Sequence, residues 1–213
     1  MVGSAAVEAV YFVTLAGAMA RLPLGTAYGV ARGGGQLVTW PISFLLMHET
    51  VTPLAALGAA LVTAGLLASA RPDGVTPRGI GWALGCAVAI GIYPVTYKAA
   101  LAAGAPEAAL FAASLSLSLP LQVLLLGARR RDRLADVLAH ERGWLPLAAV
   151  LCAGSFLSFL AALSLGGAGR ASAIRNTSVL FALAIAVRHG DKPSPRAIAG
   201  AVAIAVGAGL VAG

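Results

Sequence analysis

The sequence predicts an all-α polytopic membrane protein, and three observations support this fold class. Hydrophobic residues make up 59% of the 213 residues and charged residues only 11%, whereas soluble domains carry about 25% charged residues. The mean hydropathy is +0.89. The apolar residues recur along the whole chain in blocks of about 20, the length of helix that crosses a bilayer. A soluble globular fold is therefore disfavoured.

Eight apolar blocks are expected to form transmembrane helices, because each approaches or exceeds the length of about 18 residues that a crossing needs. Their approximate bounds are 2–20, 23–47, 52–70, 79–99, 106–127, 144–165, 169–188 and 195–213. Connectors rich in Gly, Pro and charged residues separate them. Most connectors are short, so consecutive helices should be antiparallel neighbours. The longest connector, residues 128–143, has mixed charges and is expected to form a short surface helix.

The basic residues predict an orientation rather than a nucleic-acid partner. The net charge is +7, but most of the basic residues lie in or beside connectors, and they form no basic face. The connectors after the first, third, fifth and seventh blocks hold eleven of them, namely Arg21, Arg71, Arg78, Arg129, Arg130, Arg131, Arg133, Arg142, Arg188, Lys192 and Arg196. The opposite side holds only Lys98 and Arg170. This bias places the first set in the cytoplasm and both termini outside.

The sequence holds no motif for catalysis or metal binding. The three histidines, His48, His140 and His189, lie at block ends or in connectors without the spacing of metal ligands. No HExxH, GxSxG or P-loop pattern occurs. Cys86 and Cys152 both lie inside apolar blocks, where a cysteine is usually a small buried hydrophobe. We therefore expect neither an enzyme nor a bound cofactor or metal.

Two segments of the chain repeat the same order of elements. Each has an apolar block, a tight turn, an Arg-bearing block, a charged turn with Pro and a Gly-rich block. The matching positions are Pro53 with Pro195 and Gly58 with Gly200, 142 residues apart, and Arg32 with Arg175, 143 apart. The blocks 79–99 and 106–127 have no upstream counterpart, and a complete first copy would need about 65 residues before Met1 by the same offset.

The repeat predicts a domain organisation. Residues 1–70 are expected to form three helices of a partial first repeat, residues 71–78 a linker, and residues 79–213 a complete second repeat of five helices.

The segment TWPISFLLMHETVTPLAALGAALVTAGLL resembles the EamA-like domain of the drug/metabolite transporter superfamily. In that domain a Pro-bearing helix leads into a Gly-Glu or His-Glu turn, a Pro-containing start and an LGAALVTAG-like helix. The second copy fits the same frame, with Asp191 where Glu is usual and Val179 where Pro is usual. The resemblance implies ten helices in two inverted five-helix repeats with substrate bound centrally, of which this chain lacks the first two helices. It also implies cytoplasmic termini, against the charge count for the C-terminus.

Two arginines inside the apolar blocks are the main candidates for a binding site. Arg32 and Arg175 each lie several residues inside their blocks, roughly 10–13 Å deep at 1.5 Å per residue. A charge near the bilayer centre costs about 2.5–3.5 kcal/mol. The side chains either extend to the interface or bond a neighbouring carbonyl, or they line a central cavity and bind an anion. Their related places in the two copies favour the cavity.

Polar neighbours extend this candidate site. Tyr28 and Gln36 lie one turn on either side of Arg32, and the three glycines that follow Arg32 either unwind the helix or allow a close helix crossing. Tyr93 and Tyr97 share one helix face, which serves either the cavity or, with Lys98, interfacial anchoring. Glu8 is either interfacial or a coupling residue for protons. The candidate substrate-binding residues are Tyr28, Arg32, Gln36, Tyr93, Tyr97, Arg175 and Asn176.

These observations together predict a secondary transporter that exports a small polar or anionic metabolite across a bacterial cytoplasmic membrane. A gradient of protons or of a counter-substrate would drive it. The alternative is a truncated or auxiliary membrane subunit that does not transport by itself and needs a partner chain. The expected partners are the lipid bilayer, a small-molecule substrate and either a second copy or another chain, with no nucleic acid and no cofactor.

Overall fold

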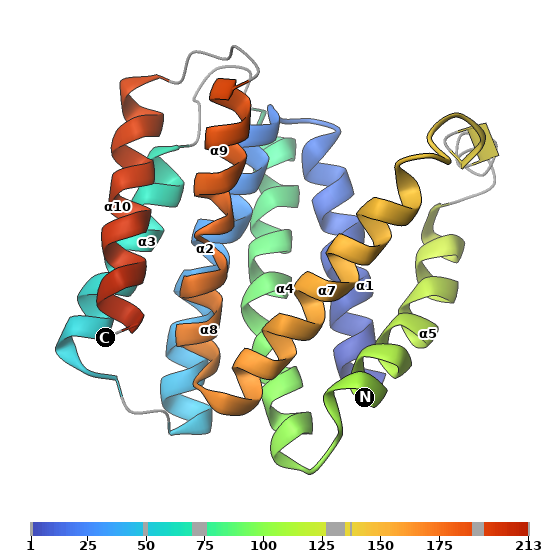
Figure 1. Cartoon of the computed structure of the whole chain (residues 1–213), viewed down its shortest axis with the longest axis horizontal. Coiled ribbons are helices and arrows are strands. Elements are labelled where there is room, and N and C mark those ends of the chain that lie inside the picture. The colour runs from blue at the N-terminus through green and yellow to red at the C-terminus, as the bar shows by residue number, and fades with distance from the viewer. Residues whose placement is uncertain are drawn as a thin grey trace.

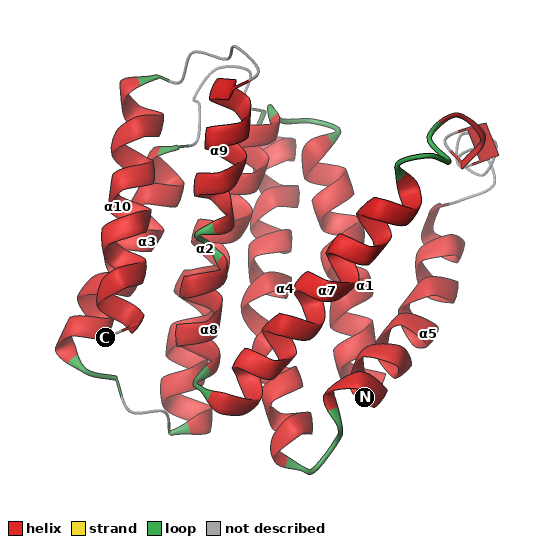
Figure 2. Ribbon diagram, viewed as in Figure 1, coloured by secondary structure: helices red, strands yellow, loops and turns green. Residues whose placement is uncertain are grey.

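The computed structural model describes residues 2–48, 51–69, 76–126, 135–136, 138–188 and 194–212. Within these residues the fold is all-helical, with nine helices and no strand (Figures 1 and 2). The helices are α1 (Val2–Met19), α2 (Leu24–Met47), α3 (Pro53–Ala68), α4 (Pro77–Ala102), α5 (Glu107–Leu126), α7 (Leu145–Leu165), α8 (Ala168–Arg175), α9 (Ser178–Arg188) and α10 (Pro195–Ala212). The expected all-α class is confirmed.

Three helices begin with the same local chemistry, a hydroxyl residue followed by proline. The hydroxyl oxygen accepts the amide hydrogen three residues later at 3.1–3.2 Å, and proline at the first helical position loses no helical hydrogen bond. These starts are Thr52–Pro53, Thr76–Pro77 and Ser194–Pro195. The turns that punctuate the sequence therefore mark true helix boundaries.

Five helices are long and apolar enough to cross a membrane. They are α1, α4, α5 over Glu107–Leu124, α7 and α10, and α3 is a shorter apolar helix of 16 residues. The long α2 and the α8–α9 segment also fill apolar blocks, but each contains a buried or half-buried arginine.

The helices run alternately up and down through the molecule (Figure 1). On one side α3 packs against α10, and in the centre α4 packs against both α1 and α2, with α5 beside α1. The α7 helix runs diagonally across the front, and the N- and C-terminal ends lie at the same end of the bundle. The opposite end carries the described basic residues Arg21, Arg78, Arg142, Arg188 and Arg196. The other basic connector residues, Arg71, Arg129–131, Arg133 and Lys192, lie outside the described residues.

The prediction of one helix over 169–188 is wrong, because α8 ends at Arg175 and α9 begins at Ser178. The backbone N–H of Asn176 donates to the carbonyls of Ser172 and Ala173, and the Thr177 hydroxyl donates to the carbonyl of Ile174. Short polar side chains compete in this way for backbone groups and so interrupt helices. The expected surface helix over 128–143 lies largely outside the described residues, although residues 138–140 are helical.

Glycines bring α3 and α10 into direct backbone contact. A Cβ built on Gly58 would lie 2.5 Å from the carbonyl oxygen of Gly207, and one built on Gly207 would lie 2.5 Å from that of Gly58. In the same way, a Cβ built on Gly65 or on Gly200 would lie 2.5 Å from the carbonyl oxygen of the other residue. Only glycine fits at these four positions, which is how small residues allow helices to approach closely in membranes.

The three glycines after Arg32 form a second close crossing. The α2 helix continues unbroken through them. A Cβ on Gly34 would lie 2.8 Å from the Ala87 Cβ, and one on Gly35 would lie 2.9 Å from the Ile90 Cβ. The glycines therefore seat α2 on α4, and the alternative of an unwound segment is wrong.

Candidate functional site

Arg32 is buried in the middle of the molecule, with 9% of its surface exposed. Its Nη2 donates to the Tyr28 hydroxyl at 2.8 Å, and the guanidinium carbon lies 5.0 Å from the centre of the Tyr28 ring. The Nε is buried and has no hydrogen-bond partner among the described residues. The expected pairing of Tyr28 and Arg32 on one helix face is present, and Arg32 keeps an unused buried donor.

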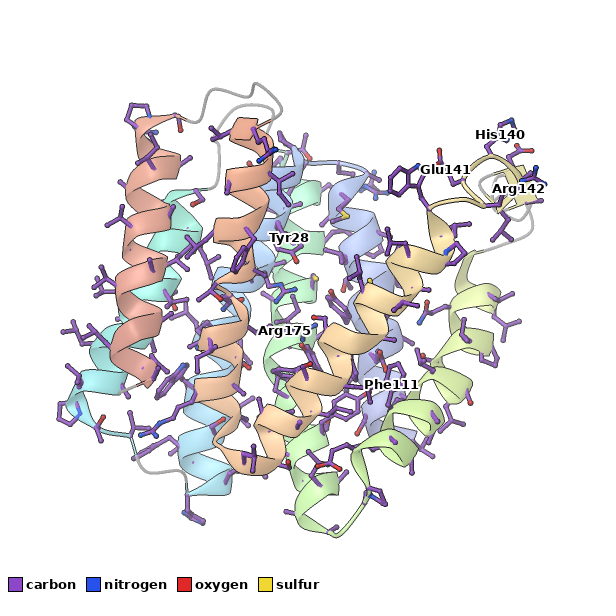
Figure 3. All side chains as sticks on the ribbon, viewed as in Figure 1. Tyr28, Phe111, His140, Glu141, Arg142 and Arg175 are labelled. Carbon is purple, nitrogen blue, oxygen red and sulfur yellow. The ribbon has the colours of Figure 1, made fainter. Side chains whose placement is uncertain are left out.

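Arg175 ends α8 and reaches a group of aromatic rings. Its Nη1 donates to the Tyr93 hydroxyl on α4. The guanidinium carbon lies 4.5 Å from the Phe159 ring centre, 5.7 Å from that of Tyr93 and 5.9 Å from that of Phe156. Figure 3 shows the labelled Arg175 and Tyr28 side chains in the middle of the molecule, away from the outer helix faces. A cation–π contact contributes about 0.5–1 kcal/mol at an exposed site and about 2 kcal/mol or more when it is desolvated.

The two arginines form related arrangements in different helices. Each donates to a tyrosine hydroxyl, and each lies over an aromatic ring. Among the residues that the structure describes, neither guanidinium forms an ion pair, although Arg175 interacts electrostatically with both Arg32 and Glu8. A pair of mutually repelling cations without a bonded carboxylate is an arrangement that an anion would stabilise.

Gln36 and Asn176 join α2 to the end of α8. Both side chains are buried, at 2% and 3% exposed. Asn176 Nδ2 donates to Gln36 Oε1 at 3.2 Å, and Gln36 Nε2 donates to the carbonyl of Gly169 at 3.3 Å. In the described structure these two candidates therefore bond protein groups, and they hold the break between α8 and α9 beside Arg32.

Glu8 and Tyr97 form a buried pair between α1 and α4. The Tyr97 hydroxyl donates to Glu8 Oε2 at 2.8 Å, and the two residues are 0% and 6% exposed respectively. Tyr97 also meets the Tyr93 ring edge to face, with the ring centres 6.0 Å apart. Glu8, Tyr93 and Tyr97 are thus buried inside the protein, and their side chains do not face lipid.

The structure adds aromatic residues that the sequence did not single out. Tyr11 lies 6.0 Å from Tyr93 by ring centres, and Phe156 and Phe159 contact Arg175. The ring centre of Phe111 on α5 lies 5.5 Å from that of Phe156, and Phe111 is labelled in Figure 3. The spacing of Phe156 and Phe159, one helix turn apart, was the available signal, but most such apolar pairs only fill a core.

Lys98 bonds backbone carbonyls at the end of α7. Its Nζ donates to the carbonyls of Leu163 and Gly166, at 2.6 Å each. The lysine therefore ties α4 to the end of α7. No group of three or more His, Cys, Asp or Glu residues that could hold a metal occurs in the described ranges.

The fold and site lead to a family assignment. The family model described as "EamA-like transporter family" matches residues 77–213, which is more than half of the chain. The chain belongs to this EamA-like transporter family. It is accordingly an integral membrane protein of a transporter family and not an enzyme, and the sequence-based resemblance to this family is confirmed.

A solved structure supports the same fold. One crystal structure superposes with a TM-score of 0.73 over 98% of this chain and 75% of its own chain, at 20% sequence identity. A search of curated protein sequences finds no significant match. At this identity, the structural likeness bears on the fold alone.

Proposed function

We propose that this EamA-like protein is a secondary transporter that exports a small anionic metabolite across a bacterial cytoplasmic membrane. One observation supports an anionic substrate. Two arginines, one buried and one half-buried, each donate to a tyrosine hydroxyl and have no ion-pair partner among the described residues. Burying a guanidinium at membrane depth is costly and usually marks a functional site. The planar fork of Arg suits carboxylate or phosphate.

The substrate would bind between α2, α4, α7 and α8. Arg32 and Tyr28 would contact it from α2, Arg175 from the end of α8, and Tyr93 from α4. Gln36, Asn176 and Tyr97 bond protein groups in the described state. They would reach substrate only by exchanging these bonds, so we place them at the edge of the site.

The α3–α10 glycines support the proposed inverted repeat. The offset of 142 residues that relates Gly58 to Gly200 also relates Gly65 to Gly207. A two-fold rotation that exchanges the two copies therefore turns the Gly58–Gly207 contact into the Gly200–Gly65 contact, and both contacts have the same 2.5 Å approach. Because α3 and α10 are antiparallel, the axis lies across them, as inverted-topology repeats require.

This symmetry also supports eight crossings among the described helices. The α8–α9 segment corresponds to α2 and would cross once as a broken helix, which is a common form at transporter binding sites. Residues 1–70 would belong to the first repeat, and the second would occupy residues 79–213. The family match over residues 77–213 supports the latter boundary.

Glu8 is the proposed coupling residue. It is the one carboxylate buried within a described helix, and it interacts electrostatically with Arg175. A proton on Glu8 changes the net charge near the arginines, so proton and anion occupancy should depend on each other. A counter-substrate that exchanges at the arginines is the other route of coupling.

The test is anion binding by variants purified in lipid nanodiscs. The probes are inorganic phosphate, a phosphate monoester, a monocarboxylate and a dicarboxylate, and the readout is the shift of the unfolding temperature. At least one anion should stabilise the parent protein. Arg175→Gln and Arg32→Gln should each lower the binding affinity for that anion about tenfold or more, since a charged hydrogen bond contributes about 1.5–3 kcal/mol. Arg188→Gln, an exposed charge at the end of α9, is the matched control. Unchanged binding by folded Arg175→Gln would refute the proposal.

An auxiliary subunit is the second candidate function. The observation that favours it is the exposed apolar surface of α7 and α9, where Val150 is 69% and Phe181 70% exposed. Either lipid or a partner helix would cover such a surface. Native mass spectrometry from membranes and transport by the purified chain in liposomes decide together: a complex with another chain supports the subunit, and transport by this chain without that partner refutes it.

A further inference from the structure

The turn between α7 and α8 is fixed to α4 by one charged side chain. Lys98 lies near the end of α4, and its ammonium group donates to the carbonyls of Leu163 and Gly166 at 2.6 Å each. The last carbonyls of a helix have no partner within the helix, and a cation there is favoured by the helix dipole. Lys98 therefore caps α7 from a neighbouring helix.

The same turn is fixed to α2 on its other side. Gln36 donates to the carbonyl of Gly169 at 3.3 Å. The indole of Trp40 fills the space beside Gly169, so that a Cβ there would lie 3.2 Å from the ring. Gly169 is buried in this contact. The start of α8 is thus held between α2 and the α7 turn.

Large apolar side chains are exposed in the first half of α7 and on one part of α9. At the start of α7, Val150 and Leu151 are 69% and 63% exposed, and on α9 Phe181 and Ile185 are 70% and 58% exposed. The buried residues of α7, in contrast, are Phe159, Leu160 and Leu163, all in its second half. The second half of α7 is therefore packed against the protein near the end where α4 and α7 finish, whereas Val150 and Leu151 in its first half are exposed.

The helical segment that follows the α7–α8 turn is broken into α8 and α9. Asn176 and Thr177 separate α8 from α9, and the backbone there uses hydrogen bonds between residues three apart. Such interruptions let one helix segment change its angle to the next. The start of α8, which is held by α2 and the α7 turn, and α9 therefore lie on opposite sides of a natural hinge.

We propose that Lys98 is the positioning residue of a gate that closes the end of the bundle where α4 and α7 finish. This inference rests on the proposed transporter function, in which one end must close while the other opens. With Lys98 bonded to the turn, α7 and α8 stay against α4 and α2. When the ammonium leaves the two carbonyls, the turn separates from α4 and opens that end of the site.

The test measures the distance between α4 and α7 at this end. Spin labels are attached to cysteines at the exposed positions Ala102 and Leu165, in a Cys152→Ser background because Cys152 is exposed and Cys86 is buried. Double electron–electron resonance in nanodiscs should give one short distance between the two spin labels in the parent protein. Lys98→Gln should add a second, longer population, and Lys98→Arg should restore the single short one.

Arg170→Gln is the matched control, because it removes an exposed cation from the same end of α8 and should leave the short distance unchanged. An unchanged distance distribution in Lys98→Gln would overturn the gate. If Lys98→Gln does not fold, the measurement on the parent protein decides, since a broad or long distribution of spin-label distances with Lys98 present also overturns the gate. No substrate is used, so a failed gate leaves the anion-binding test of the transporter untouched.

Discussion

Tyr97 donates a 2.8 Å hydrogen bond to the carboxylate of Glu8, and these two residues from α4 and α1 are both buried. The pair lies one ring contact away from the Tyr93 side chain that binds Arg175. The only carboxylate buried within a described helix is therefore connected through two tyrosines to one of the two central arginines. This connection is the physical basis for treating proton binding and anion binding as linked.

The first prediction concerns stability at this pair. Tyr97→Phe removes the donor and leaves a buried carboxylate without it, so the free energy of unfolding should fall by about 1–3 kcal/mol. Glu8→Gln keeps an acceptor for the Tyr97 hydroxyl and should cost less than Tyr97→Phe. Reversible unfolding in mixed detergent micelles measures both. Equal stability of Tyr97→Phe and the parent would show that the bond contributes nothing.

The second prediction concerns the proton on Glu8. Infrared difference spectra across a pH step should contain a carbonyl band of a protonated carboxylic acid that disappears in Glu8→Gln and shifts in Tyr97→Phe, because the hydroxyl bonds that carboxyl group. Glu107→Gln, at the start of α5, is the control and should keep the band. A band that survives Glu8→Gln would assign proton binding elsewhere.

The third prediction concerns the α3–α10 crossing. Gly58→Ala and Gly207→Ala each place a methyl group 2.5 Å from a carbonyl oxygen of the other helix, so each should lower the free energy of unfolding by about 1–3 kcal/mol. Gly209→Ala on the same helix is the control, because nothing lies within 4 Å of its Cβ position. If all three variants unfold alike, the close crossing is not what stabilises this side of the molecule.

The helices were predictable from the sequence because their signals are local. A run of apolar residues and a Thr-Pro or Ser-Pro start are both read within a few positions, and Thr52, Thr76 and Ser194 each begin a helix as such a start requires. The pairing of Tyr28 with Arg32 was also local, since both lie on one helix face.

The non-local parts of the site were not predictable in the same way. The end of α8 is held by Asn176 bonding to Gln36, 140 residues away, and a continuous apolar pattern gives no sign of that bond. Lys98 donates to backbone carbonyls. Every residue type has a backbone carbonyl, so the sequence contains no residue type that would predict this contact. Lys98 therefore remained ambiguous until α7 was placed against α4.

The fourth prediction concerns the coupling of Gln36 and Asn176. Gln36→Ala removes the acceptor of the Asn176 Nδ2 donor, and Asn176→Ala removes the donor to Gln36 Oε1, so each should cost about 1–3 kcal/mol. The double variant should cost less than the sum of the two, by about 0.5–3 kcal/mol, as contacting residues do in double-mutant cycles. Additive losses would mean that the 3.2 Å contact carries no energy of its own.

The fifth prediction concerns orientation, on which two arguments conflict. The basic connectors place the end with Arg21 and Arg142 in the cytoplasm, whereas the resemblance to ten-helix relatives implies a cytoplasmic C-terminus. In a Cys152→Ser background, Ala103→Cys should react with an impermeant thiol reagent added to intact cells, and Arg142→Cys should react only after the cells are opened. These exposed positions lie at opposite ends of the bundle, so each controls for the other. The reverse pattern would show that the family topology overrides the charge bias and would place the Lys98 gate on the cytoplasmic side.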